Sequence, residues 1–132
     1  MKFSLVILGA PYTDQAAETA YRFAVATLAR GHTIQRLFFY HDGVHNASDL
    51  LTLPQDELQP AQRWRDLIER HHLDAVVCIA AALRRGVLDD REARRFGKTA
   101  HNLGNGIRLA GLGELLDAAS ASDRLVTFGP TS

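Results

Sequence analysis

Apolar runs of strand length alternate along this chain with segments of helical pattern, and this alternation constrains the fold more than any other feature. The first run, 3–9, is continuously apolar, which is typical of a strand buried on both faces. Strands are predicted at 3–9, 33–39, 74–79, 107–110 and 123–128, and helices at 15–30, 61–71, 80–85, 89–96 and 112–119.

Strands that alternate with helices pair in parallel, because each helix carries the chain back across the sheet. The predicted fold is therefore a three-layer α/β/α domain with a mostly parallel sheet of about five strands. A chain of 132 residues suits one domain, which we place at 1–128 with a short tail at 129–132. Asp14 is the expected N-cap of the first helix and Gly31 its end. Segment 40–48 is predicted as a loop and 54–60 as a connector.

Parallel sheets place their functional sites beyond the carboxyl ends of the strands. Four segments are expected there: 9–11, 40–46, 78–85 and the region of Gly111. Cys78, the only cysteine, stands where a buried strand turns into the helix-forming stretch Ala80–Leu83. The N-terminus of such a helix favours a thiolate, which is the nucleophilic form of cysteine. Arg84 and Arg85 follow about two helical turns on and would add positive charge if they fold back.

A structural interpretation of Cys78 stays open, since free cysteine is among the most buried residue types and Val76-Val77-Cys78-Ile79 reads as core. The spacing Cys78-x5-Arg84 also occurs in cysteine phosphatases and rhodanese-type sulfurtransferases. Their anion-binding loops need glycine or small polar residues, and the five residues here are apolar and helix-forming. His41 and His45 are four residues apart with Asp42 between them, but Gly43 places them in a loop and a full set of metal ligands is missing. No nucleotide-binding loop is complete either, so we expect neither metal nor cofactor.

The composition limits the kinds of protein that this chain can be. With 15 basic and 15 acidic residues the formal net charge is zero, whereas a protein that binds nucleic acid by itself is usually basic. A single cysteine excludes an internally disulfide-bonded secreted scaffold. The first apolar run is too short for a secretory signal, and no stretch is long and apolar enough to span a bilayer. We expect a cytoplasmic protein with no direct contact to nucleic acid or membrane.

The segment from Cys78 to Val87 resembles the active segment of the DsrE family of sulfurtransferases. The resemblance continues, in the same order and spacing, over nearly the whole chain from Phe3 to Phe128. Its further motifs are Phe38-Phe39-Tyr40, Gly43-Val44, Asn46-Ala47, Asn102-Leu103, Gly111-Leu112-Gly113 and Asp123-Arg124.

The resemblance implies an enzyme, a sulfurtransferase subunit that relays persulfide sulfur for 2-thiouridine formation at the wobble position of tRNA. It implies a TusA-like sulfur donor, a TusE-like acceptor, and a heterohexamer with TusB-like and TusC-like subunits. Only the sulfur-carrying role transfers residue by residue, onto Cys78; no role transfers to His41, Asp42 or His45. Three alternatives stay open: a DsrE-type subunit of a sulfur-oxidation relay, a non-catalytic paralogue, and a flavodoxin-like binding module.

A lone cysteine cannot resolve its own persulfide through an internal disulfide, so the sulfane sulfur must leave to a thiolate on another protein. Transfer between proteins requires a reachable sulfur. We therefore expect Cys78 at a surface cleft, with Ile79–Ala82 as an apolar wall and Arg84 and Arg85 as a positively charged, partner-facing rim.

Overall fold

The computed structural model of the protein describes residues 1–54 and 60–130. Its strands form one five-stranded sheet in the order β4-β3-β2-β1-β5, in which every neighbouring pair is parallel. The predicted α/β class with a parallel sheet is confirmed. The strands are β1 (Lys2–Ile7), β2 (Thr33–Phe39), β3 (Ala75–Cys78), β4 (Ile107–Ala110) and β5 (Arg124–Phe128).

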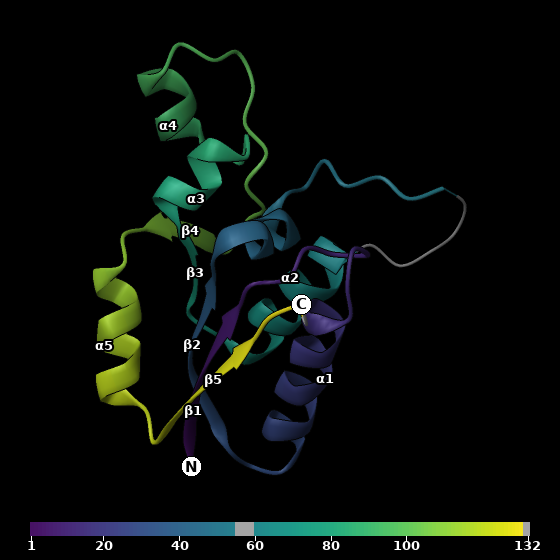
Figure 1. Ribbon diagram of the computed structural model, residues 1–132, viewed down its shortest axis with the longest axis vertical. Helices are drawn as coiled ribbons and strands as arrows, with labels where there is room; N and C mark the ends of the chain where they lie inside the picture. Colours follow the sequence, from purple (N-terminus) through teal and green to yellow (C-terminus); the bar gives the residue numbers. More distant parts are fainter. Residues whose placement is uncertain (55–59, 131–132) are drawn as a thin grey trace.

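Helices cover both faces of the sheet, as Figure 1 shows. Helices α1 (Ala16–Ala29) and α2 (Pro60–His71) lie on one face, and α5 (Gly113–Ala121) lies on the other. Two six-residue helices, α3 (Ile79–Arg84) and α4 (Asp90–Arg95), extend beyond the carboxyl end of β3. Helices α3 and α4 therefore lie at the carboxyl edge of the sheet, whereas α1, α2 and α5 cover its two faces.

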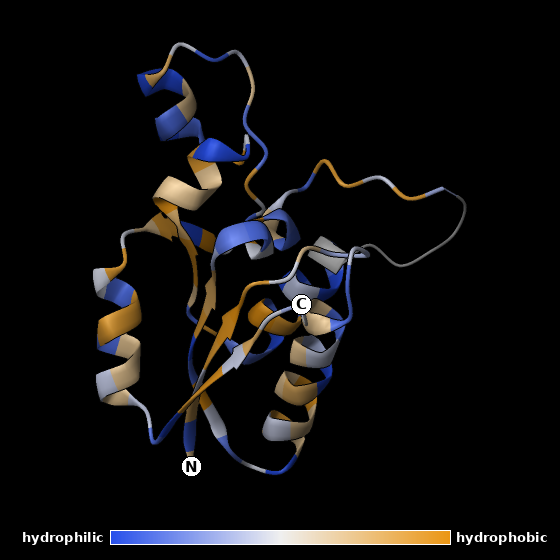
Figure 2. Cartoon of the chain, in the orientation of Figure 1, coloured by the Kyte–Doolittle hydropathy of each residue, from blue (hydrophilic) through white to orange (hydrophobic). Residues whose placement is uncertain are grey.

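The core on the α1/α2 side is aromatic. The ring of Trp64 on α2 makes edge-to-face contacts with Tyr21 of α1 and Phe39 of β2, each at 5.3 Å between centroids. Such pairs add stabilisation beyond the apolar area they bury. The strands are the most hydrophobic part of the chain, and polar residues lie on the outer surfaces of the helices (Figure 2). This pattern is the one expected of strands buried on both faces.

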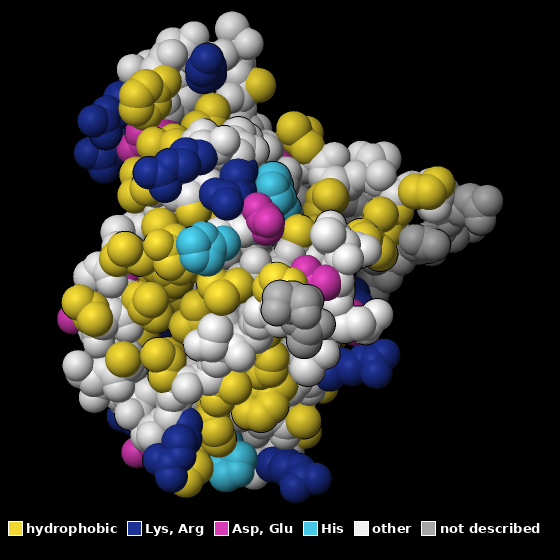
Figure 3. Space-filling view, in the orientation of Figure 1, with side chains coloured by type: hydrophobic (Ala, Val, Ile, Leu, Met, Phe, Trp, Pro, Cys, Tyr) yellow, Lys and Arg dark blue, Asp and Glu magenta, His cyan; other side chains and the backbone are white. Residues whose placement is uncertain are grey.

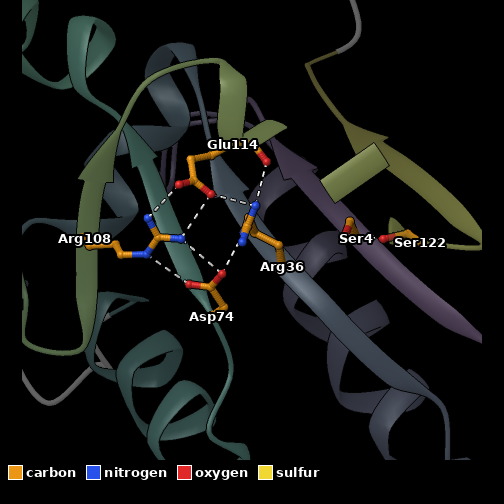
Figure 4. A network of polar contacts seen from close by, with 6 residues as sticks. All are labelled: Ser4, Arg36, Asp74, Arg108, Glu114 and Ser122. Atoms are coloured by element: carbon orange, nitrogen blue, oxygen red, sulfur yellow. Dashed lines mark hydrogen bonds and ion pairs between the residues drawn. The ribbon is translucent and has the colours of Figure 1, made fainter. Parts of the chain in front are cut away.

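The α5 side is fixed by charged groups as well as by packing (Figure 4). Arg36 of β2 is largely buried and contacts Asp74 at 2.7 Å and a carboxylate oxygen of Glu114 at 2.8 Å. Arg108 of β4 contacts the same two carboxylates at 3.2 Å. The hydrogen bond from Arg108 holds the pKa of Glu114 below its ordinary value. Burial raises the pKa of Asp74, but hydrogen bonds from Arg108 and Arg36 outweigh it and lower that pKa overall.

The two ends of α1 follow the predicted signals with one correction. Helix α1 begins one residue later than predicted, with Gln15 and not Asp14 at the N-cap position. The Asp14 carboxylate still accepts a hydrogen bond from the Ala16 N–H at 2.8 Å, so it satisfies one of the free donors of the first turn. Gly31 follows the helix with φ +81°, as expected of a helix-terminating glycine.

The prediction of a loop at 40–48 is also corrected, because residues His41–Ala47 form a 3₁₀ helix, η1. Asn46 stabilises this turn: its side-chain N–H groups donate to the carbonyl oxygens of Gly43 and Gly9, both at 3.0 Å. Gly43 lies so close to the carbonyl of Ile7 that a side chain would overlap it. The predicted connector 54–60 falls largely outside the described residues.

Candidate functional site

Cys78 is both the last residue of β3 and the N-cap of α3. Its backbone is extended, with φ −60° and ψ 119°, as is usual for an N-cap residue. The β-branched pair Val76-Val77 favours the strand and the alanines that follow favour the helix. Gly86, at φ +74°, follows the end of α3. The predicted change from strand to helix at Cys78 is confirmed.

The sheet register places the side chain of Cys78 on the face that α5 covers. Phe39 contacts Trp64 of α2, and Val77 pairs with Phe39, so both residues point to the α1/α2 side. Successive strand residues point to opposite faces. Cys78 therefore points to the α5 side, next to its partner Ala110 on β4.

Cys78 is 3% exposed. The expectation of a cysteine at a surface cleft is therefore wrong for the chain alone. The physical reason is the apolar run itself: β3 is a short strand flanked by β2 and β4 and covered on both faces, which buries all four of its residues. A protein thiol can reach this sulfur only after a local rearrangement.

The structure separates the two arginines that the sequence placed together. Arg84 is exposed at the end of α3. The Arg85 guanidinium donates from Nε to Asp42 Oδ1 at 2.8 Å and from an Nη to the Ala81 carbonyl oxygen at 3.2 Å. This hydrogen bond from Arg85 is the main reason that the pKa of Asp42 lies below its ordinary value. Arg85 is thus already paired, and Arg84 provides the exposed charge.

Sequence reasoning missed two groups that fix the segments around Cys78. Asp42 is one of them, and nothing in a linear sequence signals its ion pair with Arg85, a residue 43 positions away. Asn102 is the other. Its side chain donates to the Gly86 carbonyl at 3.0 Å and accepts from the Leu88 N–H at 2.8 Å, which holds the segment after α3 in place. Its position in the resemblance was the only available signal.

A cavity of about 380 Å³ lies between the start of α1, η1 and α2. Its lining includes Asn46, Glu18 and Arg63 but not Cys78. Arg63 lies over the Tyr21 ring at 4.0 Å and pairs with Glu18 at 2.7 Å, so these charges are compensated. Among residues 1–54 and 60–130 no group of three or more potential metal ligands comes together. No helix within the same ranges has the length and apolar character needed to cross a bilayer.

The model of the DsrE/DsrF-like family matches residues 1–128. The chain belongs to this family. A sulfurtransferase TusD homolog of Pseudomonas aeruginosa is 54% identical over 98% of each chain, and a DsrE protein of Allochromatium vinosum is 53% identical over 98% of this chain and 99% of its own. The sulfurtransferase TusD of Erwinia tasmaniensis is 45% identical over 97% of this chain and the whole of its own.

Among solved structures, the ychN protein of E. coli has a TM-score of 0.73, covering 97% of this chain and 99% of its own. At 20% identity this likeness shows the fold alone. The predicted family is thus confirmed, and sulfur transfer, the predicted class of activity, is the one for which several of these relatives are named.

Proposed function

We propose that Cys78 accepts sulfur from a persulfide and passes it to a second protein, as one step of a relay that supplies 2-thiouridine at the wobble position of tRNA. The observation that carries this proposal is the similarity, at 45–54% identity over nearly the whole chain, to proteins named TusD sulfurtransferases. Cys78 is the only cysteine, so a thiol-based transfer has one candidate atom in this chain.

The chemistry is a pair of sulfur transfers without net oxidation. The Cys78 thiolate attacks the terminal sulfur of a donor persulfide, the donor's S–S bond breaks, and the donor leaves as a thiolate. The resulting persulfide on Cys78 is then attacked at its terminal sulfur by an acceptor thiolate, and Cys78 leaves as a thiolate. Because this chain holds no second cysteine, no internal disulfide competes with the second transfer.

The proposed partners are a TusA-like donor, a TusE-like acceptor, and TusB-like and TusC-like subunits in a cytoplasmic heterohexamer. Two surfaces support protein partners. Leucines are exposed on α5 and β5, with Leu116 at 70%, and apolar side chains gather on that face of the molecule (Figure 3). Basic side chains gather over α3 and α4, where Arg84 is exposed (Figure 3). An apolar surface beside a charged rim is typical of protein interfaces.

The experiment that tests this function replaces the chromosomal gene by a Cys78→Ala allele and measures 2-thiouridine in digested tRNA by mass spectrometry. We expect the modified nucleoside to fall to the level of a deletion strain. Normal 2-thiouridine in the Cys78→Ala strain, with loss in the deletion strain, would instead favour a non-catalytic subunit. Normal 2-thiouridine in both strains would show that the protein is not needed for 2-thiouridine formation and would refute this part of the proposal.

A second candidate is a DsrE-type subunit of a sulfur-oxidation relay, favoured by the 53% identity to the DsrE protein of Allochromatium vinosum. It predicts that the Cys78→Ala strain loses growth on reduced sulfur compounds and keeps its 2-thiouridine. A flavodoxin-like binding module predicts thermal stabilisation by flavins or nucleotides, which the sulfur carrier does not.

A further inference from the structure

We propose that Asp42 and Arg85 are positioning residues whose ion pair holds α3 against η1 and thereby sets how often the buried Cys78 becomes reachable. The inference rests on the proposed function only for its purpose. Its physical content, control of access to the Cys78 sulfur, is independent of what that sulfur carries.

Cys78 joins two elements of unequal stability. On one side it belongs to β3, which is paired with both β2 and β4. On the other side it begins α3, a six-residue helix whose fully buried side chains are the small Ala81 and Ala82, while Ile79 and Leu83 are half-buried. Apolar stabilisation scales with the area buried, so α3, with two buried alanines, is held less strongly than β3, whose four residues are all buried. A movement that exposes Cys78 is therefore expected on the α3 side.

The C-terminal end of α3 is attached to its surroundings by two polar groups. Arg85 reaches across to Asp42 on η1, and its other contact, to the Ala81 carbonyl, keeps the guanidinium folded along its own helix. Beyond the helix, the Gly86 carbonyl accepts from Asn102, a buried side chain that also contacts Ser48. Asn102 is 9% exposed, whereas the Asp42 side chain is 66% exposed.

An exposed ion pair changes a conformational equilibrium by up to about fivefold, and salt screens it. Local opening of a helix lies at the low end of the stability scale of a protein, where a factor of this size alters the open population without unfolding the rest. The Asp42–Arg85 pair is thus suited to adjust access to Cys78, while the buried Asn102 preserves the local fold.

The test measures the rate at which a neutral reagent, iodoacetamide, alkylates Cys78 in the native protein, followed by intact mass. We expect Asp42→Asn and Arg85→Gln each to raise the rate about twofold to fivefold. The two changes have opposite effects on the local potential, so a purely electrostatic influence on the thiol would move the two rates in opposite directions. Breaking a shared contact moves both rates upward. The matched control is Asp90→Asn, which removes the exposed Asp90–Arg94 pair on α4 and should leave the rate unchanged.

The exchanged pair, Asp42→Arg with Arg85→Asp, should return the rate toward that of the wild type. Urea midpoints of all variants show whether a faster rate reflects global unfolding. As a second measurement, raising the salt concentration should accelerate alkylation of the wild type and have a smaller effect on Asp42→Asn. Rates for both single variants equal to the Asp90→Asn control, or rates that move in opposite directions, would overturn the proposal. Failure of Cys78 to accept sulfur would overturn the proposed function and leave this inference intact.

Discussion

The free energies of unfolding of the Cys78→Ser and Cys78→Ala variants show whether a polar side chain at position 78 can cap α3. Replacement by alanine removes one buried heavy atom from a residue that is 3% exposed. A loss of that size costs about 1 kcal/mol of the free energy of unfolding, because transfer and cavity effects add.

Serine adds a second effect of opposite sign. Cys78 is the N-cap of α3, with an extended backbone that suits a capping side chain. A serine hydroxyl there can accept from a free N–H of the first turn, and N-cap serine is typically about 1 kcal/mol better than alanine. A hydroxyl buried at this position without a partner would instead cost about 1–3 kcal/mol. We expect the cap to form, so that Cys78→Ser is about 1 kcal/mol more stable than Cys78→Ala.

Urea unfolding under reducing conditions measures this difference. Trp64 is the only tryptophan and is buried between Tyr21 and Phe39, so its fluorescence reports on the core. A difference of 1 kcal/mol corresponds to a midpoint shift of about 0.5 M urea. A serine variant that is less stable than the alanine variant would refute the reasoning, because it would mean that the hydroxyl is buried without a hydrogen-bond partner.

Two further perturbations test the fold that positions the site. Gly43→Ala should destabilise the protein by about 2 kcal/mol or more in thermal unfolding, because the added methyl overlaps the Ile7 carbonyl. The control Gly113→Ala, where the Cβ meets open space, should leave the stability unchanged. Equal effects of the two substitutions would contradict the packing of η1 on β1. The pKa values of Asp74 and Glu114 are lower in the folded protein than their ordinary values of 3.8 and 4.5, so the two carboxylates stabilise the fold at pH values above the ordinary ones, and this stabilisation is lost as the pH falls through the folded values. Arg108→Gln should therefore lower the melting temperature at neutral pH and have little effect at the acid limit. An equal decrease in melting temperature at every pH would contradict the role of this network.

Much of the architecture follows from the sequence because its signals are local. The run 33–39 predicts β2 to the residue, and Gly31 and Gly86 mark helix ends where the backbone adopts positive φ. Strand order could not be predicted, since alternation determines that strands are parallel but not which ones are neighbours. The 3₁₀ helix η1 was missed because it depends on Asn46 reaching the carbonyl of Gly9, a contact across 37 residues.

At the site, too, local features could be predicted from the sequence and contacts between distant residues could not. The position of Cys78 at a strand-to-helix change is a local property and was predicted correctly. Its burial was not, because two expectations conflict: transfer to another protein requires an exposed sulfur, whereas the run Val76-Val77-Cys78 is typical of a buried strand. The chain alone follows the second. Asp42 and Asn102 act through contacts with residues distant in sequence, which no spacing rule reveals.

The central claim, that Cys78 carries sulfur, is tested most directly by intact mass. The protein is incubated with a persulfide donor, desalted and weighed, and then mixed with an acceptor protein thiol. The account predicts that the wild type gains the mass of one sulfur atom, that it loses this mass to the acceptor, and that Cys78→Ala gains none. A gain of one sulfur that persists in Cys78→Ala, or a wild-type protein that gains none from a competent donor in the presence of its partner subunits, would contradict it.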